Sequence, residues 1–535
     1  MREHLSKIVV VALLVGVVGV PFVVRQLAAE EEITLPADAP RLVVLSPHNE
    51  QIRFEMAHGF NRWRTDRGLD PVRFDWRAGG GTSDLRKQVL AQFESAASRG
   101  VEDEGIGADL FFGGGEYEHN LLARGVTVER DGEEISISTT VPPEIDPALI
   151  DEAFPTRHIG SAPLYHEDLY WIGTTLSSFG IVYNRDVLDM LGVDPPTTWS
   201  DLADPRLRGW VALADPSHSG SIAAAYHAIL QRLGWNEGWD TLRRIFANAR
   251  YFAASSSKVP VDVSNGEAAV GMAIDFYGRY QAGAVNAYER RRGAVDQAER
   301  APRMGYVDPV KTVGGRRVSL TATTADPISL LRGAPQRELA EQFIAWVLTK
   351  DAQRLWQRRV DATGGPEKFE LRRQPIRRDM YTAQEREHWT DPEIDPFETA
   401  QPFPEAIPSF YSMVAPISHA MAIDVHSDLA AAWDALQAVP ESDPASVETH
   451  VEMRAAFFEM PAALTLTWPD EQIAQNWQTI LADPDHPRYD QAAGALAGLK
   501  QRWREMYPTD LAELKARVAW TQWFREQYEK VAAMP

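Results

Sequence analysis

Three stretches of this sequence that are polar or glycine-rich each follow a short apolar run. They are residues 46–49 (Ser-Pro-His-Asn), 79–83 (Gly-Gly-Gly-Thr-Ser) and 113–116 (Gly-Gly-Gly-Glu). Glycine allows a ligand to approach the backbone closely, and successive N–H groups in such loops can hold an anion. Tight turns between a strand and a helix also use glycine for steric reasons alone, so both interpretations stay open. The candidate ligand-binding residues in these loops are His48, Asn49, Gly81, Thr82 and Gly114.

A second group of candidates lies in the middle of the chain. Residues 215–221 (Asp-Pro-Ser-His-Ser-Gly-Ser) begin a predicted helix, whose first N–H groups lie beside small hydroxyl residues. This arrangement suits an anion, although a serine N-cap alone stabilises a helix by about 1 kcal/mol without any ligand. The candidate ligand-binding residues are Ser219, Gly220 and Ser221, then Ser256 in a polar loop, Asp275 and Tyr277 after a predicted strand, and Ser178 in an extended segment.

Common catalytic and metal-binding motifs are absent from the sequence. It contains no Gly-x-x-x-x-Gly-Lys-Ser/Thr phosphate loop, no Gly-x-Ser-x-Gly nucleophile elbow, no His-Glu-x-x-His pair and no Asp-x-Asp-x-Asp-Gly calcium loop. Carboxylate pairs are too numerous in so acidic a chain to exclude a glycosidase dyad by counting. A membrane-anchored extracytoplasmic hydrolase that uses such carboxylates therefore stays an alternative.

Charge and composition restrict the class of partner. The 535 residues carry 76 acidic and 54 basic side chains, which gives a net charge of −22 at pH 7. A negative field of that size repels nucleic acid and anionic lipid, so we expect neither as a partner. The absence of cysteine excludes disulfides, thiolate metal sites and a cysteine nucleophile, and it suits an oxidising compartment.

The N-terminus has the layout of an export signal. Arg2 and Lys7 precede an uncharged apolar run over residues 8–24. The run is long for the apolar part of a signal peptide and short for a membrane span of ~20 residues. A cleaved signal peptide and an uncleaved membrane anchor within residues 1–29 therefore stay equal alternatives. Either places the rest of the chain in the periplasm or on the extracytoplasmic face of the inner membrane, after a linker over residues 30–40.

Alternating apolar runs and helical periodicities predict an α/β architecture. The predicted strands are 42–45, 72–76, 109–112 and 269–274, and the predicted helices are 52–63, 85–93, 222–230 and 338–356. Strands that alternate with helices imply a parallel sheet with helices on its faces. Ligands of such sheets bind beyond the carboxyl ends of the strands, which is where the polar loops lie.

The last third of the chain has a different composition. From about residue 372 proline and aromatic residues become frequent, and helical periodicity then dominates, notably over 428–437, 489–506 and 510–534. We expect the Trp and Tyr side chains of this region to pack rather than to form a ligand platform. Residues 376–535 are therefore predicted to be a helical C-terminal extension.

Residues 41–360 resemble the extracytoplasmic solute-binding proteins of ABC importers, in the branch that binds ferric iron or phosphonates. The segments that carry the resemblance are, in chain order, 43–50 (VVLSPHNE), 107–113 (GADLFFG), 180–184 (GIVYN), 199–205 (WSDLADP), 215–220 (DPSHSG) and 339–344 (LAEQFI). Each segment is weak alone, and the ordered set is more specific.

The resemblance implies a two-lobed periplasmic-binding-protein fold of type II, with hinge strands between the lobes. Lobe 1 would span residues 41–165, completed by 318–375, and lobe 2 would span 166–317. No catalysis and no cofactor are implied, because the solute closes the lobes and the closed form docks on a membrane permease. A monomer is expected. A receptor or interaction module without a transport role is the other alternative.

The resemblance also implies a ligand set. In the iron-binding relatives a loop histidine, an acidic residue after the third strand and two adjacent tyrosines hold the metal, and an anion lies on a Ser/Gly helix start. His48 and Tyr277 correspond to the histidine and one tyrosine, whereas the second tyrosine is Phe276 and the nearest acid is Glu116. We therefore expect a small anionic solute, namely Fe³⁺ with an anion, a phosphonate or a phosphorylated organic molecule. His48 and Tyr277 are metal ligands only if iron is bound.

Overall fold

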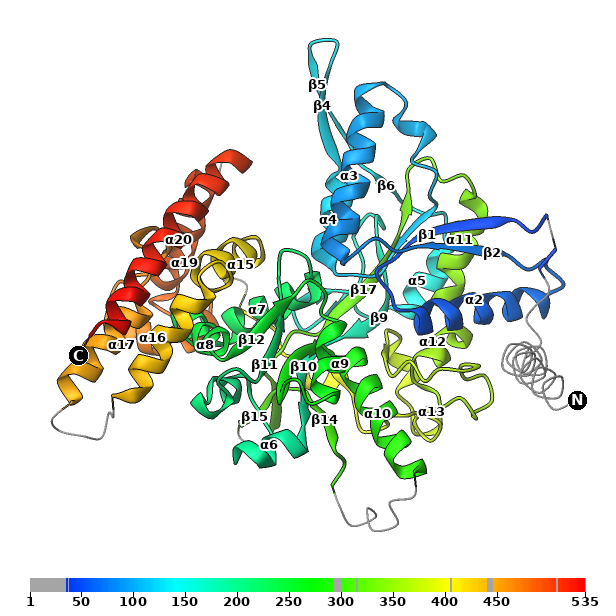
Figure 1. The fold of residues 1–535 in the computed structure, drawn as a ribbon. Coiled ribbons are helices and arrows are strands. Elements are labelled where there is room, and N and C mark those ends of the chain that lie inside the picture. The colour runs from blue at the N-terminus through cyan, green and yellow to red at the C-terminus, as the bar shows by residue number, and fades with distance from the viewer. Residues whose placement is uncertain are drawn as a thin grey trace, which may run out of the picture.

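The computed structural model describes residues 35–534, except 37, 293–300, 314–315, 405–406, 440–445 and 507–508. These residues form two mixed β-sheets, each covered by helices, and a group of helices from the last part of the chain (Figure 1). The predicted two-lobed α/β fold with a helical C-terminal region is therefore confirmed. The apolar run over 8–24 lies outside the described residues, and among those described no helix has the length and hydropathy of a membrane span.

The larger sheet forms the centre of the first lobe. Its strands are β1 (Arg41–Leu45), β2 (Arg73–Arg77), β3 (Leu110–Phe112), β6 (Thr140–Val141), β9 (Ile172–Ser177), β17 (Thr324–Leu331) and β18 (Gln374–Pro375). They lie in the order β18-β9-β17-β3-β1-β2, with β6 beside β17. β1 is parallel to β2 and β3 as predicted, whereas β17 is antiparallel to both β3 and β9.

Helices from two distant parts of the chain cover this sheet. They are α2 (Glu50–Thr65), α3 (Thr82–Ser98), α4 (Glu116–Arg124), α5 (Pro147–Ala153), α11 (Arg337–Val347) and α12 (Lys350–Gln357). The apolar face of α2 meets α11, where the rings of Phe60 and Phe343 lie edge to face with centroids 5.1 Å apart. The single helix predicted over 338–356 is two helices, because Thr349 caps α12: its Oγ1 accepts a hydrogen bond from the N–H of Ala352.

The smaller sheet forms the centre of the second lobe. Its strands are β10 (Phe179–Asn184), β11 (Val211–Ala214), β12 (Ala249–Ala253), β13 (Val270–Ile274) and β14 (Met304–Val307), in the order β12-β11-β13-β10-β14. Its helices are α6 (Arg185–Leu191), α7 (Gly220–Leu233), α8 (Trp235–Ala247), α9 (Lys258–Ser264) and α10 (Asp275–Arg291). β11 is parallel to β12 and β13, and β10 is antiparallel to β13 and β14.

Three two-stranded ribbons complete the strands of the described residues. They are β4 (Val126–Arg130) with β5 (Glu133–Ile137), β7 (His158–Ile159) with β8 (Ala162–Pro163), and β15 (Val310–Val313) with β16 (Arg316–Ser319). The ribbon of β4 and β5 projects from the top of the first lobe in Figure 1.

The chain crosses between the two sheets at Ser178 and again over residues 320–323. β9 and β10 are separated only by Ser178, yet β9 belongs to the larger sheet and β10 to the smaller one. The first crossing therefore lies at Ser178 rather than at the expected boundary after residue 165. The reason is that β9 is buried along its whole length and pairs with β17, with Ser177 opposite Thr324.

The C-terminal region is divided between the two lobes. Its helices are α13 (Ala383–Arg386), α14 (Pro396–Thr399), α15 (Tyr411–Ser418), α16 (His426–Ala438), α17 (Val447–Phe458), α18 (Glu471–Leu481), α19 (Tyr489–Met506) and α20 (Asp510–Ala532). Phe397 and Ala400 pack against the core of the larger sheet. From Phe410 onward the buried residues share one core with the smaller sheet.

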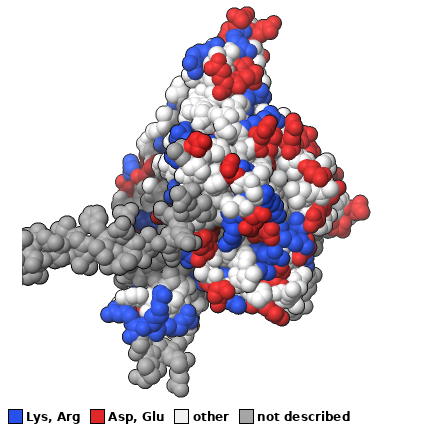
Figure 2. All heavy atoms as spheres, turned by 90° about the vertical axis from the view of Figure 1, so that its right-hand side faces the viewer, with Lys and Arg blue, Asp and Glu red and all other residues white. Residues whose placement is uncertain are grey.

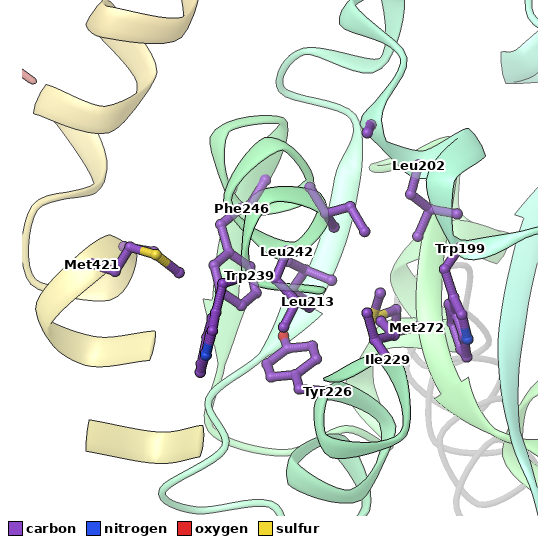
Figure 3. Close-up of a cluster of buried hydrophobic side chains, with 14 of the residues drawn as sticks. Trp199, Leu202, Leu213, Tyr226, Ile229, Trp239, Leu242, Phe246, Met272 and Met421 are labelled. Carbon is purple, nitrogen blue, oxygen red and sulfur yellow. The ribbon is translucent and has the colours of Figure 1, made fainter. Parts of the chain in front are cut away.

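Figure 3 shows this shared core. Met421, in a π-helical turn after α15, lies beside Trp239 and Phe246 of α8. The predicted extension is thus continuous with the hydrophobic core of the second lobe rather than a separate unit.

Charges of both signs occur on the face in Figure 2. Basic side chains gather at its lower left, acidic side chains are frequent along its upper right-hand edge, and the two signs alternate between these areas.

Candidate functional site

A cavity of about 780 Å³ lies between the two lobes. Its walls are the segments that follow β1 and β3 in the first lobe and β11 and β13 in the second, together with residues from the C-terminal region. The cavity therefore lies beyond the carboxyl ends of the parallel strands, where α/β sheets bind ligands. Its size is that of a pocket for a small organic molecule rather than for a single ion.

The two lobes touch beside this cavity. Gly81 of the first lobe packs so closely on the second that an added Cβ would lie 2.1 Å from the carbonyl oxygen of His218. The His218 Nδ1 lies 3.5 Å from Oδ1 of Asp84, across the same contact. The structure is therefore in a closed form.

Ten of the twelve predicted ligand-binding residues line this one cavity. They are His48, Asn49, Gly81, Thr82, Gly114, Ser219, Gly220, Ser221, Ser256 and Tyr277. Ser178 and Asp275 do not line it, contrary to expectation: Ser178 donates a hydrogen bond to Asp308 at 2.8 Å, and the side chain of Asp275 is buried. Alternation explains the difference at the hinge, because Ser177 lines the cavity and its neighbour Ser178 is directed elsewhere.

The start of α7 presents a chain of hydroxyl groups to the cavity. Ser219 is the N-cap of α7 and its Oγ lies 3.1 Å from that of Ser221, which in turn lies 2.8 Å from the Oγ of Ser256. These hydroxyls and the first N–H groups of α7 can donate hydrogen bonds to a negatively charged group. The helix dipole favours the same sign of charge.

A buried charge cluster lies at the wall formed by the first lobe. His48 Nε2 lies 3.0 Å from Oδ2 of Asp326, and the guanidinium of Arg373 forms an ion pair with the same carboxylate. Burial would raise the pKa of Asp326, but Arg373 and His48 outweigh it and lower the pKa to about 2. Burial lowers the pKa of His48, and Arg373 adds to that effect, although Asp326 acts in the opposite direction. The net lowering of the pKa favours the neutral ring of His48 beside the guanidinium of Arg373.

These neighbours do not suit Fe³⁺. Burial raises the pKa of Tyr277 to about 12, although Arg373 acts in the opposite direction, so the phenol keeps its proton at neutral pH. Within the described residues no group of three or more His, Asp or Glu side chains is placed to hold a metal ion. The cationic Arg373 next to His48 also opposes a metal cation.

Glu116 is the carboxylate of the cavity that has no fixed partner. It is the first residue of α4, and its buried Oε2 accepts no hydrogen bond from any described residue. Burial raises the pKa of Glu116 to about 7. At neutral pH this group can therefore either donate a proton in a hydrogen bond or accept one.

The C-terminal region supplies a further wall, which the sequence analysis did not predict. Tyr411 donates a hydrogen bond from its hydroxyl to the carbonyl oxygen of Gly220 at 2.9 Å, and its ring packs at a tilt against Tyr117 of α4 with centroids 4.2 Å apart. Tyr411 therefore contacts both lobes at once. The sequence carried no local signal for this position, or for Arg373 and Asp326, because their partners are distant along the chain.

Comparisons with known proteins agree with this architecture. Residues 72–354, just over half of the chain, match the profile of the bacterial extracellular solute-binding protein family. An uncharacterized protein of Haemophilus influenzae is 30% identical over 179 residues, which are 33% of this chain and 44% of that protein. The chain thus aligns with less than half of that relative.

Two solved structures are similar in fold at low sequence identity. The periplasmic binding protein AfuA of Actinobacillus pleuropneumoniae, with fructose-6-phosphate bound, is 17% identical, and the match covers 74% of this chain and 97% of AfuA with a TM-score of 0.46. Iron-bound HitA of Pseudomonas aeruginosa is 17% identical, with 68% and 92% coverage and a TM-score of 0.43. By its sequence profile, this chain belongs to the family of bacterial extracellular solute-binding proteins.

Proposed function

We propose that this chain is the extracytoplasmic solute-binding component of an ABC importer. It captures a small anionic solute between its two lobes and delivers it to a permease in the membrane. Residues 1–29 act as an export signal or as an anchor in the inner membrane, and the chain works as a monomer. The observation that carries the proposal is the closed cavity between the lobes, to which both contribute polar groups.

The anionic character of the solute is supported by the helices that begin at the cavity. α3, α4 and α7 start with residues of its lining, and α2 starts directly after the lining residue Asn49, so their N–H groups and dipoles favour negative charge there. The net charge of −22 repels anions at long range. Affinity must therefore come from short-range donors, such as those of Ser219 and Ser221.

Iron is the less favoured solute. The phenol of Tyr277 is protonated, and the ring of His48 is held between Asp326 and Arg373. A phosphonate, a phosphorylated molecule or a carboxylate fits the hydroxyl groups and N–H donors of the α7 start better.

One observation favours a hydrolytic activity, but it is not sufficient to propose one. Ser217 Oγ lies 3.3 Å from Nε2 of His419, whose Nδ1 lies 3.0 Å from Asp424, as in a Ser-His-Asp triad. However, the same Nε2 also lies 3.1 Å from Asp215. Burial would lower the pKa of His419, but hydrogen bonds and charges from Asp215 and Asp424 raise it, which favours the protonated ring over the free base that a triad needs. Ser217 and His419 also lie outside the cavity lining.

Two substitutions at the α7 start test the proposed anion site. An added Cβ at Gly220 would lie 3.4 Å from both Tyr411 and Glu118, which is ordinary contact, so the further methyl groups of valine would occupy the cavity. Gly220→Val should abolish binding. Ser221→Ala removes one hydroxyl and keeps the backbone donors, so it should weaken binding only about two- to tenfold.

The measurement is calorimetric titration with inorganic phosphate and with the solute that co-purifies with the wild-type chain. Binding to Gly220→Val with wild-type affinity would place the anion elsewhere and leave the α7 start as an ordinary helix cap.

A further inference from the structure

The middle of α7 presents a histidine, His227, to the cavity. His227 and Ser221 both line the cavity from α7, and His227 follows Ser221 by six positions along the helix. At 1.5 Å per residue the two positions are roughly 9 Å apart along the helix axis. A solute that places its anionic group at the start of α7 can therefore reach His227 with a second group roughly that far from the first.

The C-terminal region fixes which nitrogen of this ring carries a proton. The N–H of Phe410 donates a hydrogen bond to Nε2 of His227, and the two nitrogens are 3.0 Å apart. A ring nitrogen that accepts a hydrogen bond carries no proton, so the neutral ring carries its proton on Nδ1. Burial lowers the pKa of His227 to about 3, and Lys500 adds to that effect, so the ring is neutral at physiological pH.

The other ring nitrogen, Nδ1, is left for a solute. It forms no hydrogen bond with a described residue and is not enclosed by protein atoms, and the residue lines the cavity. The ring is held in place by the hydrogen bond from Phe410 and by an edge-to-face contact with Tyr411, whose ring centroid lies 5.8 Å away. The Nδ1–H group of His227 is therefore a hydrogen-bond donor of fixed orientation, and it cannot serve a group that only donates.

Lys500 of α19 adds a positive charge to this part of the cavity. It donates a hydrogen bond to the carbonyl oxygen of Ser409 at 2.9 Å, so the peptide group between Ser409 and Phe410 contacts both Lys500 and His227. Lys500 lines the cavity, and no carboxylate of the described residues forms an ion pair with it. Its charge favours an oxygen atom of the solute and opposes an ammonium group.

We propose that His227 is a specificity-determining residue, whose Nδ1–H donates a hydrogen bond to an acceptor oxygen of the solute. The solute is then an anion that also carries an acceptor, such as a carbonyl or ether oxygen, several bonds away from its charged group. This inference rests on the proposed function and extends it, because it assigns a second group of the solute. The C-terminal region takes part in this specificity through Phe410 and Lys500.

Two substitutions separate the donor from the structural role of the ring. The side-chain amide of glutamine ends three bonds from Cβ, as Nε2 does, so His227→Gln can still accept the hydrogen bond from Phe410 but has no donor in place of Nδ1. The amide of asparagine ends two bonds from Cβ, as Nδ1 does. His227→Asn therefore keeps a donor toward the cavity and leaves the N–H of Phe410 without its acceptor. The control is His388→Gln, which lies outside the cavity lining.

The probes are phosphonates with chains of about four to nine carbon atoms, which cover the roughly 9 Å between the two positions on α7. At each length one probe ends in a methyl ketone, which only accepts hydrogen bonds, one in a plain alkyl group, and one in an ammonium group, which only donates. All are titrated calorimetrically into the full chain, beside inorganic phosphate. Long-range ¹H–¹⁵N spectra of the histidine-labelled chain report which ring nitrogen is protonated, and the signals of His227 are assigned by their loss in His227→Gln.

For the wild-type chain and for His388→Gln we expect the methyl ketone of at least one length to bind about three- to tenfold more tightly than its alkyl counterpart. The ammonium probe of that length should bind no more tightly than the alkyl probe. His227→Gln should bind the ketone and alkyl probes equally, His227→Asn should keep part of the preference, and the spectra should show the proton of His227 on Nδ1. If His227→Gln melts at a lower temperature than the wild type, the spectra and the probe series of the wild-type chain decide.

Three results would overturn the inference and leave the proposed function standing. They are a proton on Nε2 of His227, equal affinity for the ketone and alkyl probes at every length, and a preference that His227→Gln keeps and His227→Asn loses. If neither inorganic phosphate nor any phosphonate binds the wild-type chain, the proposed function fails together with the inference.

Discussion

The contact between Gly81 and His218 makes closure of the lobes testable with one methyl group. Gly81 has φ −77° and ψ 172°, which any residue adopts, so Gly81→Ala introduces no backbone strain of its own. The added Cβ would lie 2.1 Å from the carbonyl oxygen of His218, a backbone atom of the other lobe. The two segments must separate by roughly 1 Å to admit it, and a packed interface resists such a shift.

Gly81→Ala should raise the free energy of the closed form and leave that of the open form unchanged. Overpacking of this kind typically costs about 1–3 kcal/mol, which is roughly a 5- to 150-fold change in the ratio of closed to open molecules. The affinity for a solute that requires closure falls by the same factor. Gly79→Ala is the matched control in the same loop, because its Cβ would meet the end of the flexible Gln88 side chain at 3.2 Å and Leu85 at the ordinary contact distance of 3.5 Å.

Two readouts test this expectation. Calorimetric titration with the co-purified solute should give weaker binding to Gly81→Ala than to the wild type or to Gly79→Ala. Small-angle X-ray scattering should give a larger radius of gyration for solute-bound Gly81→Ala. If Gly81→Ala binds and contracts like the wild type, the contact between residues 79–82 and His218 is not part of the closed state, and the reasoning is refuted.

Three further predictions concern iron, which we propose to be the less favoured solute, and two groups of charged residues. Ferric iron should give no intense visible absorption band with the wild-type chain, and Tyr277→Phe should leave the spectrum unchanged. A strong band that Tyr277→Phe abolishes would show that Tyr277 binds iron and would contradict our preference for an anionic solute without iron. Arg373→Met leaves the buried carboxylate of Asp326 with the ring of His48 as its remaining partner and should lower the free energy of unfolding by about 3–5 kcal/mol in urea titrations. Asp326→Asn in addition should recover part of this loss, and an unchanged midpoint for Arg373→Met would show that the ion pair is not needed. Because the pKa of His419 is raised, its ion pairs stabilise the fold fully below about pH 6.5 and are lost as the pH rises through the raised value. Burial would raise the pKa of Asp215, but hydrogen bonds from His419 and Ser217 lower it to about 2. The ionised carboxylate of Asp215 therefore stabilises the fold above about pH 4, and this stabilisation is lost as the pH falls toward 2. Urea unfolding of His419→Ala should therefore show a smaller loss of stability between pH 6 and 9 than the wild type, and an equal loss would contradict this.

Local pattern was sufficient to predict much of the first lobe. The periodicity of Ile52, Met56 and Phe60 corresponds to the buried face of α2, and the loops after β1 and β3 lie at the cavity because parallel strands carry their carboxyl ends to one edge. The serine-rich start of α7 could also be predicted from the sequence, because N-capping residues and glycine have strong local preferences.

Features built from distant residues could not be predicted in this way. His48 and Arg373 are 325 positions apart, and they meet only because β17 and β18 join the larger sheet. The same holds for Tyr411, which was expected only to pack and which bonds to Gly220 across 191 positions. Lys500 has no motif around it and reaches the cavity because α19 shares the core of the second lobe.

The central claim is that the cavity between the lobes holds a small anionic solute. Native mass spectrometry of the chain, purified without denaturation, tests it most directly. We expect a bound small molecule with one or more negative charges, which denaturation releases and which Gly220→Val no longer retains. A wild-type chain that carries no small molecule after incubation with periplasmic extract, or a solute without negative charge, would contradict it.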